Sequence, residues 1–154
     1  MGITHWDDVE KFHRERGQMS ATWTPLGGAA GSWRAGATRI ELDPGVLSGP
    51  PHVHSAEEEI FVVLAGDGAL ELTPAGREAE PDAHAVRRGS VVARPPGTKV
   101  AHAFRAGDSG LTLIAWGTRD PNDICWYPRS NKVFFRGLGL IARLEPLDYF
   151  DDEE

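Results

Sequence analysis

Several features that mark other classes of protein are scarce in this chain of 154 residues. Its single cysteine, Cys125, allows no internal disulfide and suits a reducing compartment. No apolar run approaches the ~20 residues that cross a bilayer, and the first residues lack the basic start and apolar centre of a signal peptide. The sequence has 16 basic and 23 acidic residues, and the resulting net charge of −7 argues against nucleic acid and anionic membranes as partners. These absences predict a cytoplasmic protein.

Turn-forming residues are abundant instead. Eighteen glycines and eleven prolines without a fixed period predict many turns between short strands. The predicted strands lie at residues 19–24, 37–42, 61–64, 69–72, 99–104 and 111–116, with two more inside 84–95. The glycines at 66–68 predict a hairpin. Because no strand–helix alternation appears, the sequence predicts an all-β sandwich or barrel.

One helix is predicted, at residues 6–16, with acidic residues near its start, basic residues near its end and Gly17 terminating it. The length of the chain favours one domain, residues 1–154. Within it we expect a helical segment at 1–18, a barrel at 19–117 and a β extension at 118–154. The extension is rich in aromatic residues. It either forms a lid or a strand exchanged with a partner subunit, or adds strands that cover a sheet edge.

The stretch GPPHVHSAEEEIFVVLAGDG, residues 49–68, concentrates potential metal ligands. His52 and His54 lie two residues apart, so on a strand both imidazoles point to one face. Three consecutive acids follow. The last of them, Glu59, is the favoured partner because it begins the apolar run at 60–64. Two imidazoles and a carboxylate form a mixed nitrogen and oxygen set that suits a divalent transition metal.

The other charged residues near this stretch are expected to be structural. Glu57 and Glu58 are interpreted as rim charges, although a shift of one residue in register would make Glu58 the ligand. The remaining histidines outside any ligand pattern are His5, His13 and His84. Cys125 is expected to be a small buried hydrophobe rather than a reactive thiol.

This stretch resembles the first signature of the cupin superfamily: His, any residue, His, three or four residues, Glu, six residues, Gly. His52, His54, Glu59 and Gly66 fit it with a four-residue spacer. The second cupin signature is Gly, five residues, Pro-any-Gly, two residues, His, and its first part fits GSVVARPPG at residues 89–97.

The final histidine of the second signature is displaced. Val100 stands at its position, and His102 follows two residues later. A shift of two preserves strand parity, so the resemblance implies His102 as the fourth ligand of the metal. Parity further predicts that Phe61 and Val63, with Val100 and Phe104, line an apolar cavity.

The resemblance implies an all-β, double-stranded β-helix (jelly-roll) barrel of cupin type with a short N-terminal helix, and a homodimer. Its metal would be Fe, Mn, Ni, Co or Zn, held by His52, His54, Glu59 and His102. One of several bases near the barrel could hold a substrate carboxylate, while most are expected to be surface charges. These bases are Arg39, Arg94, Lys99 and Arg105.

Two functions follow from this set of residues. The first is a metal-dependent enzyme, an oxygenase or an isomerase or lyase, acting on a small organic molecule. The alternative is a non-catalytic barrel that binds or senses a small molecule or a metal. The sequence assigns no catalytic residue beyond the ligands, because one fold hosts unrelated chemistries.

Overall fold

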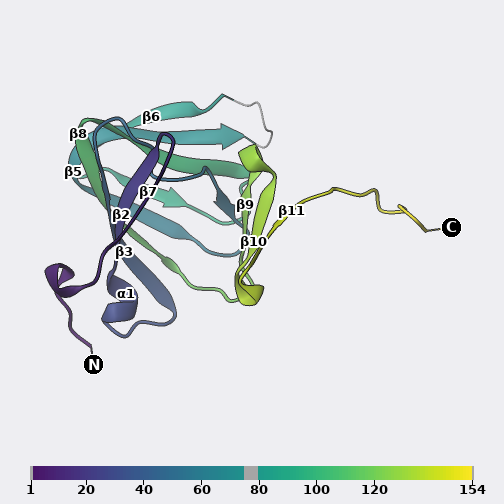
Figure 1. The fold of residues 1–154 in the computed structure, drawn as a ribbon, viewed down its shortest axis with the longest axis horizontal. Coiled ribbons are helices and arrows are strands. Elements are labelled where there is room, and N and C mark those ends of the chain that lie inside the picture. Colours follow the sequence, from purple (N-terminus) through teal and green to yellow (C-terminus); the bar gives the residue numbers. More distant parts are fainter. Residues whose placement is uncertain (1, 75–79, 154) are drawn as a thin grey trace.

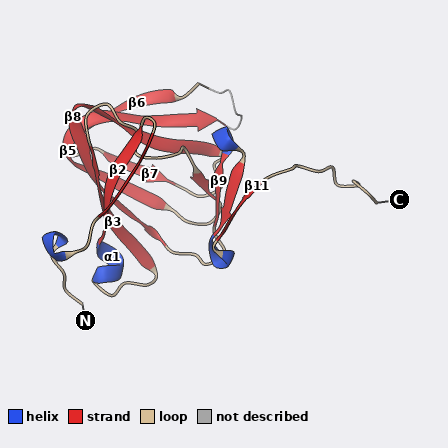
Figure 2. Cartoon of the chain, in the orientation of Figure 1, coloured by secondary structure: helices blue, strands red, loops and turns tan. Residues whose placement is uncertain are grey.

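The computed structural model describes residues 2–74 and 80–153, which are mainly antiparallel strands (Figures 1 and 2). The strands are β1 (Phe12–Arg16), β2 (Met19–Pro25), β3 (Ala35–Leu42), β4 (Val53–His54), β5 (Glu59–Pro74), β6 (Asp82–Arg87), β7 (Val91–Arg94), β8 (Val100–Thr118), β9 (Ile124–Tyr127), β10 (Lys132–Phe135) and β11 (Leu140–Arg143). The helical elements are α1 (Leu26–Ala29) and three 3-10 helices, Trp6–Asp8, Pro128–Ser130 and Arg136–Leu138. Within these residues, none of the helices has the length and apolar character needed to cross a membrane.

The strands form two sheets. A seven-stranded sheet has the order β1-β2-β3-β8-β5-β6, with β7 also paired to β5, and a four-stranded sheet has the order β11-β10-β9-β4. The sheets curve into an open barrel whose interior is bounded by β3, β5 and β8 (Figure 1). The predicted all-β class is therefore confirmed, and short helical elements are present.

Alternation along the strands directs one apolar face inward. Phe61 and Val63 on β5 pack with Phe104, Leu111 and Leu113 of β8 in one buried cluster. The aromatic rings of Phe61 and Phe104 lie 4.8 Å apart between centroids. This cluster packs beside the ends of β5 and β8 that carry the predicted ligands.

The helix predicted over residues 6–16 is limited to the 3-10 helix at its start. Residues 12–16 form β1 instead, which pairs with β2 in a hairpin closed by Gly17 and Gln18. Gly17 has a φ of 61°, so the glycine expected to end a helix provides the turn of this hairpin. The pairing is reinforced by stacking of Phe12 on Trp23 at 5.4 Å.

The hairpin predicted at residues 66–68 is also wrong. The chain continues through it as the single strand β5, and Asp67 lies at a bulge opposite the glycine-rich segment of β8. Gly66 has a φ of 76°, and a Cβ atom there would collide with the carbonyl oxygen of Gly110. These glycines therefore allow two long strands to bend together, which an isolated sequence window does not distinguish from a turn.

The C-terminal extension supplies β9, β10 and β11, and β9 pairs with β4 of the same chain. It therefore provides extra strands for the second sheet. Beyond β11 the chain leaves the barrel as an extended arm (Figure 1).

Candidate metal centre

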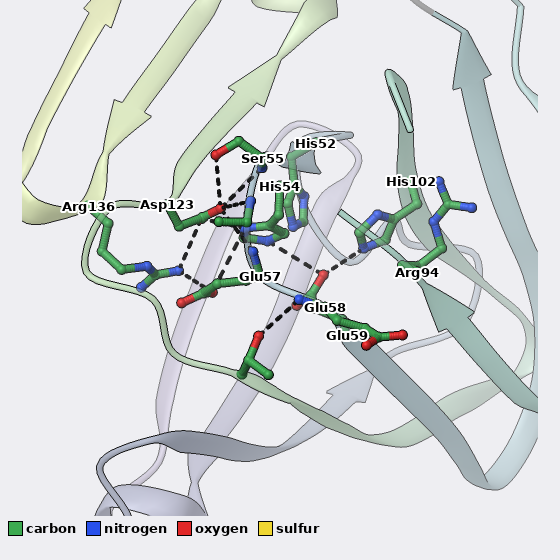
Figure 3. A network of polar contacts seen from close by, with 12 residues as sticks. His52, His54, Ser55, Glu57, Glu58, Glu59, Arg94, His102, Asp123 and Arg136 are labelled. Atoms are coloured by element: carbon green, nitrogen blue, oxygen red, sulfur yellow. Dashed lines mark hydrogen bonds and ion pairs between the residues drawn. The ribbon is translucent and has the colours of Figure 1, made fainter. Parts of the chain in front are cut away.

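Strands from both sheets bring the four predicted ligands together (Figure 3). His52 lies just before β4 and forms an isolated bridge with His102 of β8. The His52 amide donates to the His102 carbonyl oxygen at 3.2 Å, and the His102 amide donates to the His52 carbonyl oxygen at 2.8 Å. His54 ends β4 and Glu59 begins β5. The ligand-bearing segments are thus fixed to one another by backbone hydrogen bonds and short connections.

The side chains converge on one oxygen atom. Glu59 Oε2 lies 3.2 Å from His102 Nε2 and 3.5 Å from His54 Nε2. The ring of His52 lies 4.7 Å from that of His102 and 5.2 Å from that of His54, between centroids. His52, Glu59 and His102 each offer a ligand atom, and these atoms lie within 4.8 Å of one another. Ligand atoms at ~2.1 Å from one ion lie ~3–4 Å apart, so this spacing fits a shared metal.

Hydrogen bonds on the outer side of two rings fix their tautomers. His52 Nδ1 lies 3.0 Å from the carbonyl oxygen of Pro50, and His54 Nδ1 lies 2.7 Å from Asp123 Oδ2. Both partners only accept, so each Nδ1 carries the hydrogen and the Nε2 of the neutral ring presents a lone pair. This arrangement is typical of metal-ligating histidines.

The protonation states also suit a metal. Burial and the neighbouring His102 imidazole lower the pKa of His52 to about 4, so the ring is neutral near pH 7. Burial opposes ionisation of Glu59, but the hydrogen bond and charge of His102 outweigh it and lower the pKa of Glu59 to about 2. The site therefore offers a neutral imidazole at His52 and an ionised carboxylate at Glu59, which are the forms that bind metal.

Two atoms test whether these residues fit a cation. Glu59 Oε2 and His102 Nε2 are both buried and lie 3.2 Å apart, and neither has a further hydrogen-bond partner among the described residues. A divalent ion bound between the two would be coordinated by both atoms. The residues present therefore fit a transition metal.

A cavity of about 260 Å³ opens beside His52, Glu59 and His102. Phe61 and Phe104 contribute to its largely apolar wall, as the sequence predicted. The other two predicted lining residues do not border it: Val63 is in the buried core, and Val100 lies on β8 outside the lining. Tyr127 and Arg119 add polar groups to the wall.

Glu57 is not a rim charge. It is 1% exposed, and burial raises its pKa against the opposing charge of Arg136. Its carboxylate accepts from Arg136 Nη2 at 2.6 Å and from the amide of Asp120 at 3.0 Å, and it pairs with Arg119 at 3.4 Å. Glu58, by contrast, is exposed, as expected of a rim residue.

The basic residues singled out from the sequence do not line the cavity. Arg39 and Arg105 pair with carboxylates on their own sheet, Arg94 donates to a backbone carbonyl, and Lys99 is exposed. Arg119 lies at the cavity instead. It follows β8 directly, and its guanidinium packs over Gly36, where a Cβ atom would collide with it.

Asp123 was not predicted from the sequence. It accepts a hydrogen bond from His54, which lies 69 positions earlier in the chain. No spacing pattern connects the two residues, because their contact depends on the pairing of β4 with β9. Cys125 on β9 is buried, as predicted, and burial raises the pKa of its thiol to about 12. The histidines outside the ligand set, His5, His13 and His84, are exposed.

Comparison with known proteins agrees with this architecture. The family model for the cupin domain matches residues 38–116, which is just over half of the chain. The chain therefore belongs to the cupin family. No curated protein sequence matches it.

Solved structures share the fold over most of the chain. A proposed sugar phosphate isomerase from Acidithiobacillus ferrooxidans superposes with a TM-score of 0.75 at 24% identity, covering 92% of each chain. A sugar phosphate isomerase of the cupin superfamily from Silicibacter pomeroyi gives 0.75 at 23% identity, covering 97% of this chain and 98% of that one. A predicted oxalate decarboxylase from Thermotoga maritima gives 0.60 at 18% identity, covering 75% of this chain and 97% of that one.

Proposed function

We propose that the chain binds one divalent transition metal through His52, His54, Glu59 and His102, and acts as an enzyme on a small oxygen-rich organic molecule. The observation that carries the proposal is the pair of buried atoms Glu59 Oε2 and His102 Nε2, which face each other at 3.2 Å with no further partner among the described residues, at the point where the ligands converge. A bound metal would supply either Lewis-acid polarisation of a carbonyl, as in an isomerase or lyase, or activation of oxygen, as in an oxygenase.

The cavity limits the size of the substrate. At about 260 Å³ it is smaller than the ~300–1,000 Å³ of sites for drug-sized ligands, so a molecule of a few carbon atoms is expected. Its apolar wall restricts water, and the few polar groups provide orientation. Fixed hydrogen-bond donors act strongly in such a setting because few waters compete with them.

Two side chains are suited to orient that molecule. Burial raises the pKa of the Tyr127 phenol, which therefore stays protonated near pH 7 and can donate through its hydroxyl. Arg119 is the cation of the cavity wall, and its guanidinium suits a carboxylate or a phosphate. Together with the positive charge of a bound metal, Arg119 favours an anionic substrate.

Metal content tests the first half of the proposal. We expect about one equivalent of metal in the wild-type chain, measured by elemental analysis at neutral pH. Glu59→Gln should lose it, since the change keeps the shape of the side chain and removes its charge. Glu58→Gln carries the same substitution one residue away on an exposed side chain and should bind as the wild type does. A wild-type chain without metal, even after reconstitution, would overturn the proposal.

Turnover tests the second half. The metal-loaded chain is incubated with sugar phosphates, oxalate and short hydroxy acids, and products are followed by NMR together with oxygen consumption. The structural relatives only guide this choice, because identities of 24% or less show the fold alone. Product that forms with the wild type and not with Glu59→Gln supports an enzyme. A ligand that binds tightly and is recovered unchanged supports the alternative, a non-catalytic binding or sensing barrel.

A further inference from the structure

A buried carboxylate outside the ligand set is joined to one of the ligands. Asp123, which precedes β9, is 1% exposed, and its Oδ2 accepts from His54 Nδ1 at 2.7 Å (Figure 3). Backbone amides, which can only donate, bind its other oxygen, so the carboxylate meets His54 as an acceptor.

The two oxygens of Asp123 have different partners. Oδ1 accepts from three successive amides, those of Ser55 at 3.1 Å, Ala56 at 3.0 Å and Glu57 at 3.3 Å. Oδ2 is left for His54, with Arg136 Nη2 at 3.7 Å. The three amides fix the carboxylate in one orientation, so one defined oxygen faces the imidazole.

We infer that Asp123 is a positioning residue that locks His54 as the Nδ1–H tautomer and so presents its Nε2 lone pair to the metal. The inference rests on the proposed function for its metal half. The tautomer itself follows from the geometry of the pair, because three amides bind Oδ1 and leave Oδ2 to accept the hydrogen of Nδ1.

The surrounding contacts hold Asp123 in place and exclude a metal of its own. His54, Glu57 and Asp123 also lie close enough to form a ligand group. However, Glu57 is already bound by Arg136 and Arg119, and the Asp123 oxygens already accept from a ring and three amides. Two guanidinium groups thus already supply the positive charge that faces these carboxylates. This cluster is therefore a support for the metal centre rather than a second centre.

Asp123→Asn tests the inference because the amides determine how the asparagine must lie. Its carbonyl oxygen has to take the place of Oδ1, facing the amides of Ser55, Ala56 and Glu57. Its NH₂ group then faces His54 Nδ1 and requires that nitrogen to accept. The hydrogen of the neutral ring moves to Nε2, and the lone pair directed at the metal is lost.

Long-range ¹H–¹⁵N NMR of the metal-free chain reads the tautomer directly. We expect His54 to carry its hydrogen on Nδ1 in the wild type and on Nε2 in Asp123→Asn. Asp120→Asn is the matched control, since among residues 2–74 and 80–153 its carboxylate accepts only from the exposed amide of Asn122, and the change should leave His54 unchanged. An Nε2–H tautomer in the wild type would overturn the inference without any variant.

Metal affinity, measured by calorimetry with Zn²⁺ and with Mn²⁺, completes the test. Asp123→Asn should weaken binding about 10–100-fold, the usual effect of losing an outer partner of a ligating histidine. If the effect passes through His54, the double variant with His54→Ala should bind no more weakly than His54→Ala alone. Wild-type affinity in Asp123→Asn, or an additive loss in the double variant, would refute the positioning role. Absence of metal in the wild type would instead refute the proposed function.

Discussion

Arg119 and Lys99 show how differently two cations of the barrel are placed. Both side chains are exposed, but only Arg119 packs over Gly36 and borders the cavity. Its bonds to Glu57 and to the Thr118 carbonyl are both 3.4 Å, and they leave part of the guanidinium unused. It is thus the side chain best placed to select an anionic substrate.

Replacing Arg119 should weaken the binding of anions without removing the metal. We expect Arg119→Gln to lower the affinity of the metal-loaded chain for oxalate and for phosphate about 10–100-fold, which corresponds to the ~1.5–3 kcal/mol of a charged hydrogen bond. Calorimetry with each anion measures this loss, and elemental analysis checks the metal. Arg143→Gln, on the exposed strand β11, is the control. Equal anion affinity in wild type and Arg119→Gln would exclude this role.

The proximity of the four proposed ligands could be predicted because they follow strand parity. His52, His54 and Glu59 lie in one short stretch. His102 stands two residues beyond the position expected from the signature, and a shift of two leaves a side chain on the same face of a strand. Asp123 and Arg119 could not be predicted this way. Their roles depend on the pairing of distant strands and on the path of the chain after β8, and no local spacing encodes either.

At the scale of elements, the glycines at 66–68 show the limit of turn propensity. A glycine-rich triplet between apolar runs predicts a hairpin, yet here it bends β5 where it crosses β8. Residues 6–16 are a second example. Their charge pattern predicts a helix, but residues 12–16 form β1 and pair with β2 instead. In both cases the deciding contact is made with a strand elsewhere in the chain.

Two glycines allow the energetic cost of a left-handed backbone conformation to be separated from that of a steric clash at the bulge. Gly66 and Gly45 have nearly the same φ, 76° and 74°, but a Cβ at Gly45 would meet nothing within 4 Å. Gly45→Ala should therefore lose about 1–2 kcal/mol of unfolding free energy from the left-handed conformation. Gly66→Ala should lose about 1–3 kcal/mol more from the clash with Gly110. Denaturant unfolding measures both, and equal losses would contradict the assigned clash.

At the scale of the whole molecule, the proposed metal connects the two sheets. Its ligands come from β4 in the smaller sheet and from β5 and β8 in the larger one, together with His52 before β4. A group that binds the folded chain and not the unfolded one stabilises it by mass action. The stabilisation is about 4 kcal/mol when the free metal exceeds its dissociation constant 1,000-fold.

Chelation should therefore lower the melting temperature. For a domain of this size, 4 kcal/mol corresponds to a shift of about 8–16 °C. Calorimetry of the reconstituted chain, before and after removal of metal by a chelator, measures the shift. Glu59→Gln should melt at one temperature in both conditions, which controls for effects of the chelator itself. A wild-type chain with the same melting temperature in both conditions would contradict a site that connects the sheets.

The smaller sheet also bears on assembly. β11 is its outer strand, with no neighbour on its far edge among residues 2–74 and 80–153. Leu140 and Ile141 on this strand are 50% and 60% exposed, and the arm that follows exposes Tyr149 and Phe150. An unprotected edge with apolar side chains favours pairing with another chain, so we keep the prediction of a homodimer and assign it to this edge.

Light scattering coupled to size exclusion tests that assignment. We expect the mass of a dimer for the wild-type chain and the mass of a monomer for Ile141→Lys, because a charge on the edge would have to be buried in the contact. Ile3→Lys introduces the same charge at another exposed isoleucine and should remain dimeric. Metal content should be equal in all three chains, since the edge lies outside the ligand set. A monomeric wild type would refute the dimer, and a dimeric Ile141→Lys would place the contact on a different surface of the barrel.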